Sequence, residues 1–172
     1  MNTELFHPAP RGLPVAIRPP RGSNEVLESL ERCDWNSLGK GRSGELLRAG
    51  ALWLHGFLDE SHSIAQGIDS PEGSYWHALM HRSEGDFSNS KYWYRRVGRH
   101  AIFPALLGAV RQLEVSSSST LAAIRDLSDW DPFRLVDAME QAARRETEEE
   151  VLLQAIAREE YNLLMGYCLS QV

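Results

Sequence analysis

The sequence predicts an all-α protein with a single domain and an extended N-terminal arm. No segment alternates apolar and polar residues with the two-residue period of a strand, whereas many segments carry apolar residues at helical spacing. Residues that favour helix starts stand before these segments. The chain has 172 residues, a length at which one domain is usual and a core forms without disulfides.

Residues 1–22 are predicted to be an extended arm. Five of the eight prolines lie in this segment, and proline fixes φ and lacks the amide donor that helices and central strands use. We expect the arm to lie along the domain or along a partner chain. Residues 23–172 are expected to form one irregular bundle of six or seven helices.

The first hundred residues contain four helical patterns, each with an apolar stripe and a capping residue. These patterns cover residues 23–33, 45–66, 71–84 and 88–97. The third has the clearest limits, because Ser70 can cap it, Pro71 suits its first position and Gly85 suits its end. The connection between the first two patterns is rich in turn residues.

Four more helical patterns follow in the second half of the chain. They cover residues 104–113, residues 121–127, a segment that starts at Pro132, and residues 147–168. Thr147 and Glu150 have the spacing of a capping box at the start of the last one. The serines at 116–119 are interpreted as a linker or cap within one domain, because the chain that follows is too short to fold alone.

Charge and cysteine content narrow the function classes. The 18 Lys and Arg against 24 Asp and Glu give a net charge of −6, which argues against a general affinity for nucleic acid or anionic lipid. Cys33 and Cys168 lack the spacing of a zinc ribbon or a redox motif, and we interpret them as reduced packing residues. With neither a secretory signal pattern nor a long apolar stretch, the sequence predicts a cytoplasmic protein that does not enter the membrane.

Residues 75–100 are the most distinctive segment. They hold three of the six histidines, two of the five tryptophans and three of the five tyrosines. The charge over 77–100 is +3, whereas residues 126–160 carry −7, so we expect part of the basic segment to dock on the acidic one. Charged and aromatic residues in this mixture are typical of a cleft or an interface.

His77 and His81 are four residues apart and therefore share one face of the helix predicted over 71–84. Two imidazoles one turn apart can hold a metal ion such as Zn²⁺. Ala78 stands where a zincin protease would have its catalytic Glu, so the sequence argues against that class.

A third metal ligand is expected from the helix predicted over 45–66. His62 is our first choice, with His55 and Asp59 as alternatives, because these three lie on one side of that helix. The histidines could instead act as acid–base or hydrogen-bonding groups, or be buried without a function. His77, His81 and Arg82 are the candidates for catalysis, either hydrolysis by metal-activated water or acid–base chemistry.

Polar residues beside His81 are candidates for binding a small anionic molecule. They are Arg82, Asp86, Asn89, Trp93, Arg95 and His100. The amide end of the helix predicted from Ser88 would add favourable partial charge there. A purely structural interpretation is also open, in which Asp86 caps this helix and Arg82 pairs with Glu84 or Asp86.

The run over 91–96 combines Tyr, Trp and Arg and supports two further hypotheses. In the first, the protein is an interaction module that forms a homodimer through this run. In the second, the run binds a nucleotide or RNA, because aromatic and Arg side chains can stack on bases and clamp phosphates. The acidic composition and the lack of known RNA-binding motifs argue against the second hypothesis.

Residues 77–100 read HALMHRSEGDFSNSKYWYRRVGRH. This block resembles one in a group of uncharacterised bacterial proteins, whose version is approximately H-x-x-x-H-R-R-E-x-D-x-x-N-x-x-Y-W-x-R and continues a few residues later with H-P. The present chain departs from it at Ser83 and Ala101, where the group has Arg and Pro. The resemblance implies importance for a set of eight residues but no reaction. The set is His62, His77, His81, Arg82, Asn89, Trp93, Arg95 and His100.

Overall fold

The computed structural model describes residues 20–39, 41–113, 119–145 and 149–171. This part of the chain contains ten α-helices, more than the six or seven expected, and no strand, which confirms the all-α prediction. The helices are α1 (Asn24–Glu31), α2 (Trp35–Leu38), α3 (Arg42–Leu54), α4 (Leu58–Ala65), α5 (Pro71–Glu84), α6 (Phe87–Val97), α7 (Phe103–Gln112), α8 (Ser119–Arg125), α9 (Pro132–Arg145) and α10 (Glu149–Ser170).

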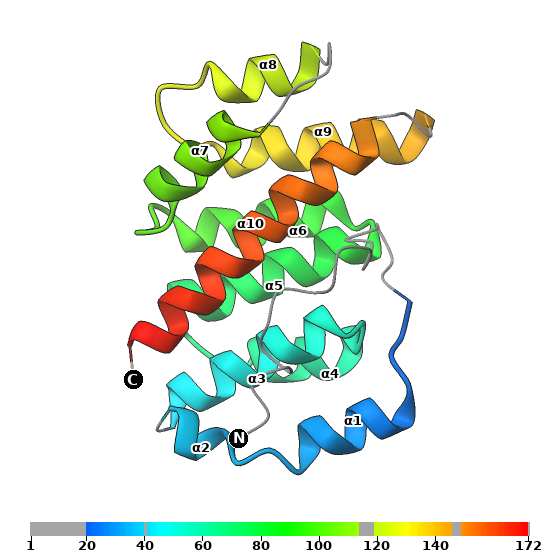
Figure 1. Ribbon diagram of the computed structural model, residues 1–172, viewed down its shortest axis with the longest axis vertical. Helices are drawn as coiled ribbons and strands as arrows, with labels where there is room; N and C mark the ends of the chain where they lie inside the picture. The colour runs from blue at the N-terminus through cyan, green and yellow to red at the C-terminus, as the bar shows by residue number, and fades with distance from the viewer. Residues whose placement is uncertain (1–19, 40, 114–118, 146–148, 172) are drawn as a thin grey trace.

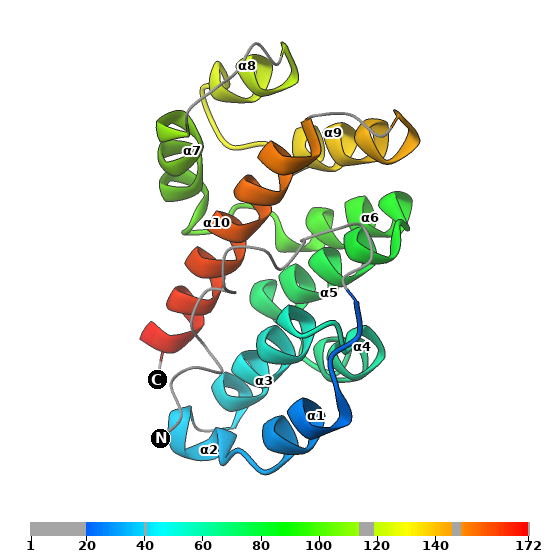
Figure 2. The same ribbon diagram turned by 45° about the vertical axis from the view of Figure 1, so that its right-hand side comes forward.

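Helix α5 occupies the centre of the molecule, with α6 packed along it and α3 and α4 against it (Figure 1). Helix α10 crosses the bundle obliquely, from α9 at one end to α3 at the other. Helices α1 and α2 lie at the α3 end, and α7, α8 and α9 form the opposite end, as the second view also shows (Figure 2). In the described part of the chain, no helix combines the length and the apolar character needed to cross a bilayer.

Helix α5 begins and ends where the sequence predicted. The Ser70 hydroxyl accepts a hydrogen bond from the Gly73 amide at 3.1 Å, and Gly85 ends the helix with φ of +81°. Eleven of its fourteen residues are buried, so α5 has hardly any solvent-facing side. Buried serines tie its neighbours in place: Ser61 of α4 donates to the Ala49 carbonyl of α3, and Ser90 of α6 donates to the Ala78 carbonyl of α5, each at 2.9 Å.

The prediction of one continuous helix over 45–66 was wrong, because a turn separates α3 from α4. Gly56 adopts a φ of +74°, which favours glycine, and a Cβ there would lie 2.4 Å from the Pro20 carbonyl oxygen. Phe57 follows and is fully buried, which holds the turn against the core. Because of this turn, α4 does not continue along the axis of α3. A short helix, α2, also forms within the connection predicted to be a loop, with Asp34 as its cap.

Several predicted features fall outside the described residues. They are the arm up to residue 19, the serine run through residue 118, and Thr147 of the predicted capping box. Residues 20–22 lie across the α3–α4 turn, where the Gly22 amide donates to the His55 carbonyl at 2.9 Å. Arg21 pairs with Glu60 of α4 beside this contact.

A buried ion pair connects α5 to α10. The Arg82 guanidinium donates to the Glu160 carboxylate at 2.6 Å, and their side chains are 3% and 0% exposed. Tyr75 of α5 and Tyr94 of α6 each donate a hydroxyl to the other Glu160 oxygen at 2.8 Å. Arg82 also donates to the Tyr94 hydroxyl at 3.0 Å. Three helices therefore meet at one carboxylate.

Electrostatics keep Arg82 charged and the hydroxyls of Tyr75 and Tyr94 protonated. Burial opposes the charge on Arg82, but the adjacent Glu160 carboxylate outweighs it, so the pKa of Arg82 is raised. Burial also raises the pKa of Tyr75 and of Tyr94 well above the ordinary value, so both hydroxyls stay protonated and act as donors.

Glu160→Gln should destabilise the protein by about 3–5 kcal/mol, because it leaves the Arg82 charge buried without a counter-charge. The double variant Arg82→Met/Glu160→Gln should recover much of this loss, since its amide oxygen still accepts from both tyrosines and no charge remains. Urea denaturation measures both. Glu159→Gln, the same change one residue away at a half-buried position, is the control and should stay within about 0.5 kcal/mol of wild type. Equal losses in the two single variants would contradict the structural role of the pair.

Candidate functional site

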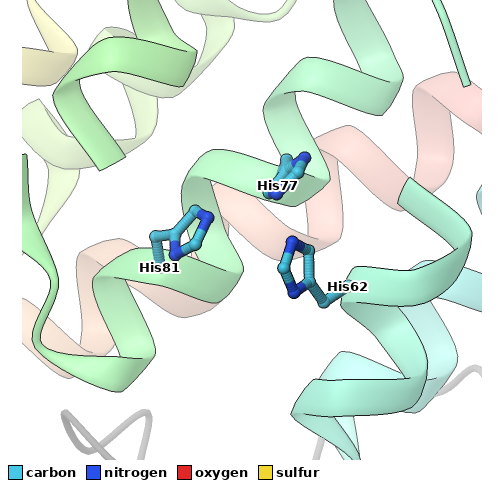
Figure 3. A group of neighbouring side chains, drawn as sticks. All are labelled: His62, His77 and His81. Atoms are coloured by element: carbon cyan, nitrogen blue, oxygen red, sulfur yellow. The ribbon is translucent and has the colours of Figure 1, made fainter. Parts of the chain in front are cut away.

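Three histidines from α4 and α5 face one another (Figure 3). One ring nitrogen from each of His62, His77 and His81 lies within 4.8 Å of the others. The ring centroids are 4.4 Å apart for His62 and His77, 5.2 Å for His62 and His81, and 4.9 Å for His77 and His81. These are the three residues that the sequence predicted as candidate metal ligands.

Local structure explains why His62 is the member contributed by α4. The Ser61 bond to the Ala49 carbonyl fixes α4 against α3, and the adjacent His62 side chain faces α5. The alternatives lie elsewhere. His55 is on the other side of the Gly56 turn, where its carbonyl accepts from residue 22, and Asp59 is exposed in the first turn of α4.

His77 is buried without a hydrogen-bond partner. Its residue is 2% exposed, and neither ring nitrogen has a partner within the described part of the chain. The Trp93 ring of α6 stacks on it with centroids 3.8 Å apart and planes 16° from parallel. A buried polar atom without a partner costs about 1–3 kcal/mol, so the folded protein keeps this imidazole at an energetic cost.

His81 is held by residues on both sides of the turn that ends α5. Its Nδ1 lies 3.2 Å from the Glu84 carboxylate, which accepts the Nδ1–H. That leaves the lone pair on Nε2, which the Asn89 side-chain amide approaches at 3.0 Å. A carboxylate on one imidazole nitrogen is the usual way in which proteins orient a metal-binding histidine.

The surroundings keep the buried imidazoles neutral. Burial and, to a smaller extent, the neighbouring His62 and His81 lower the pKa of His77 from its ordinary value of 6.5 to about 3. Burial also lowers the pKa of His81, although Glu84 opposes that effect. Neutral imidazole is the form that binds metals, so these two ligands need not lose a proton at neutral pH.

The geometry needs only a small adjustment to hold a metal. Two nitrogen ligands of tetrahedral Zn²⁺ at about 2.0–2.1 Å lie roughly 3.3 Å apart, and the cluster atoms are within 4.8 Å of one another. His62, which is partly exposed, can close part of this difference by moving its side chain. The three nitrogens come from two helices that are already fixed against each other, so the chain needs no large rearrangement.

The other candidate ligand-binding residues divide into four groups. Asn89 and Trp93 contact the histidines. Arg82 points into the core toward Glu160, and its predicted pairing with Glu84 or Asp86 does not form. Asp86 caps α6 by accepting from the Asn89 amide at 3.1 Å, which lowers its pKa.

Arg95 and His100, the remaining two, lie away from the histidine cluster. Arg95 lies over the Phe133 ring of α9, 5.7 Å from its centroid. His100 lies 3.7 Å from the Glu72 carboxylate and packs edge-on against Tyr75. The structure therefore does not gather all six predicted residues in one pocket.

The Tyr/Trp/Arg run is divided in the same way. Trp93 covers His77 and Tyr94 is buried in the Glu160 network, whereas Tyr92 is 50% exposed. Lys91 pairs with Asp137 and Glu140 of α9, which confirms that part of the basic segment docks on the acidic one.

Two residues that contact the candidate residues were not predicted from the sequence to do so. Glu84 was assigned only a structural pairing with Arg82, and its position three residues after His81 was the available signal. Glu160 had no local signal, because it lies 78 residues from Arg82 along the chain.

Comparison with protein-family models, with curated proteins and with solved structures finds no match for this chain.

In the metal-free protein, the free energy of unfolding should decrease as the pH falls from about 6.5 toward about 3. The pKa of His77 is about 3 in the folded protein and 6.5 ordinarily, so between these values the unfolded chain binds a proton that the folded protein does not. Stability is therefore full above the upper value and falls by at most about 1.4 kcal/mol per pH unit for this proton.

Urea denaturation in the presence of a chelator, at several values between about pH 7 and pH 4, measures this slope. His77→Gln cannot bind this proton. Its free energy of unfolding should therefore depend less steeply on pH than that of wild type, by the equivalent of up to one proton. An unchanged slope in that variant would contradict the assignment.

Proposed function

We propose that the protein binds one divalent transition-metal ion through His62, His77 and His81, with Zn²⁺ as the best chemical match, and that the metal site takes a small anionic ligand. The observation that carries the proposal is His77. This imidazole is buried, has no hydrogen-bond partner in the described part of the chain, and stands beside two further imidazoles.

The donor set supports a borderline metal. Imidazole nitrogens suit Zn²⁺, Cu²⁺, Ni²⁺ and Fe²⁺, whereas Mg²⁺ and Ca²⁺ prefer oxygen ligands. Glu84 supplies the second-shell carboxylate on His81, and Trp93 closes one face of His77. Both contacts would fix the rings in place before a metal arrives.

Three protein ligands leave a coordination position open. Sites of this kind accept water or a substrate atom at that position, and bound metal lowers the pKa of such a water to about 7. A cationic centre beside the partly exposed His62 would also attract anions. Since His62 is the partly exposed member, we place the open position on its side of the cluster. A site with such an open position would support either hydrolysis by a metal-bound water or the binding of an anion.

The two alternatives for the histidines are less well supported. A general acid or base works best with a pKa near the working pH, and the pKa of His77 is lowered to about 3. A buried histidine without a function would be expected to have a hydrogen-bond partner. A metal explains both the missing partner and the neutral state.

Metal-free, untagged protein should bind one equivalent of Co²⁺, used as a coloured substitute for Zn²⁺, and develop the intense visible absorption of four-coordinate Co²⁺. Zn²⁺ should displace it and raise the melting temperature. His62→Ala should weaken binding at least about 100-fold, more than the 10–100-fold that loss of a second-shell partner costs. Glu84→Gln should weaken it by about 10–100-fold.

His100→Asn is the matched control, because it changes another buried histidine outside the cluster and should keep wild-type metal affinity. His62 is the preferred variant because its partial exposure makes misfolding a minor concern. Absence of stoichiometric metal, or a Co²⁺ spectrum that is the same in His62→Ala and wild type, would refute the proposal.

A further inference from the structure

A cavity of about 600 Å³ lies on another side of α6, where the end of α6, the start of α7 and the start of α9 come together. None of the histidines of the metal cluster, and neither Glu84, Asn89 nor Trp93, contributes to its lining. Its volume is within the range of about 300–1,000 Å³ that is typical of small-molecule sites.

The walls of the cavity are mainly aromatic and aliphatic. Phe103 and Leu107 of α7 form one side, and Trp130 and Phe133, before and within α9, form another. Trp130 is 6% exposed, and its indole N–H has no hydrogen-bond partner in the described part of the chain. The Trp130 ring is thus held in the wall of the cavity although its buried donor costs free energy.

The rim of the cavity is cationic. Arg95 and Arg99 are exposed and form no ion pair with a described carboxylate, although Arg95 lies over the Phe133 ring. A third arginine, Arg111, is fixed there by a 2.7 Å hydrogen bond to the Leu127 carbonyl. Two unpaired guanidinium groups at the mouth of an apolar cavity give it the charge pattern of an anion site.

Two carboxylates in the lining reduce this positive charge only in part. Asp131 accepts from the Phe133 amide at 2.9 Å and lies 3.9 Å from Arg134, so it caps α9. Asp129 is exposed and lies 3.5 Å from the Ser128 hydroxyl. Helices α7 and α9 both begin at the cavity, and their N-terminal ends add partial positive charge.

We propose that this cavity is a second binding site, independent of the metal, for a small molecule with an aromatic body and one anionic group, a carboxylate or a phosphate monoester. The aromatic body lies between Phe103, Trp130 and Phe133, and the anion contacts Arg95 and Arg99. Arg95 and His100, which the sequence linked to the histidines, belong to this site instead.

The test uses 2-naphthoate, 2-naphthyl phosphate and the neutral 2-naphthamide, titrated into the metal-free protein and followed by calorimetry and by the NMR signals of the tryptophan indoles. At least one of the two anions should bind with a stoichiometry of one and shift the Trp130 indole signal, assigned with Trp130→Phe. The double variant Arg95→Gln/Arg99→Gln should weaken anion binding at least about tenfold, as expected for loss of charged hydrogen bonds, and leave 2-naphthamide unaffected.

The matched control is Arg32→Gln/Arg42→Gln, which removes the same charge from exposed positions just after α1 and on α3 and should not change affinity. His62→Ala should also bind the naphthyl anions normally, so this result is separate from the fate of the metal proposal. Failure of both anions to saturate a site, equal losses in the two arginine double variants, or equal affinity for the amide and the anions would each overturn the inference.

Discussion

The fold depends on one constraint: α5 is buried on nearly all sides and nevertheless carries ionisable residues. Without water, each of these groups must find its partner within the protein. For Arg82 the partner is Glu160, and the pair forms only if α10 crosses α5 at that level. Tyr94 brings α6 to the same carboxylate. Because the network fails if any of the three helices shifts, it specifies their arrangement more narrowly than apolar contacts alone would.

The same constraint gives the histidine cluster its chemical character. On α5, Tyr75, His81 and Arg82 all have hydrogen-bond partners, and His77 alone among the buried ionisable residues has none in the described part of the chain. Burial also makes the rings neutral, so they present lone pairs rather than charges. A metal ion that reached these lone pairs would therefore not have to displace a proton. The burial that makes Arg82 depend on Glu160 thus also sets the protonation state of the histidines.

Local signals predicted the parts of the structure that depend on neighbours in sequence. The cap at Ser70, the end at Gly85 and the shared face of His77 and His81 all arise within a few turns of one helix. The turn at Gly56 was not predicted, because its need for glycine comes from the approach of the Pro20 backbone. The partner of Arg82 was not predicted either, since it depends on the path of a helix that begins some 65 residues later.

The division of residues 75–100 between the histidine cluster and the cavity follows from the geometry of α6. Successive residues of a helix are about 100° apart, so Trp93 and Arg95 point in directions that differ by about 200°. One face thus covers His77, and the opposite face lines the cavity beside α7 and α9. Tyr94 lies between them and donates to Glu160. A dense run of polar and aromatic residues in sequence therefore need not form one site, because adjacent residues of a helix face different neighbours.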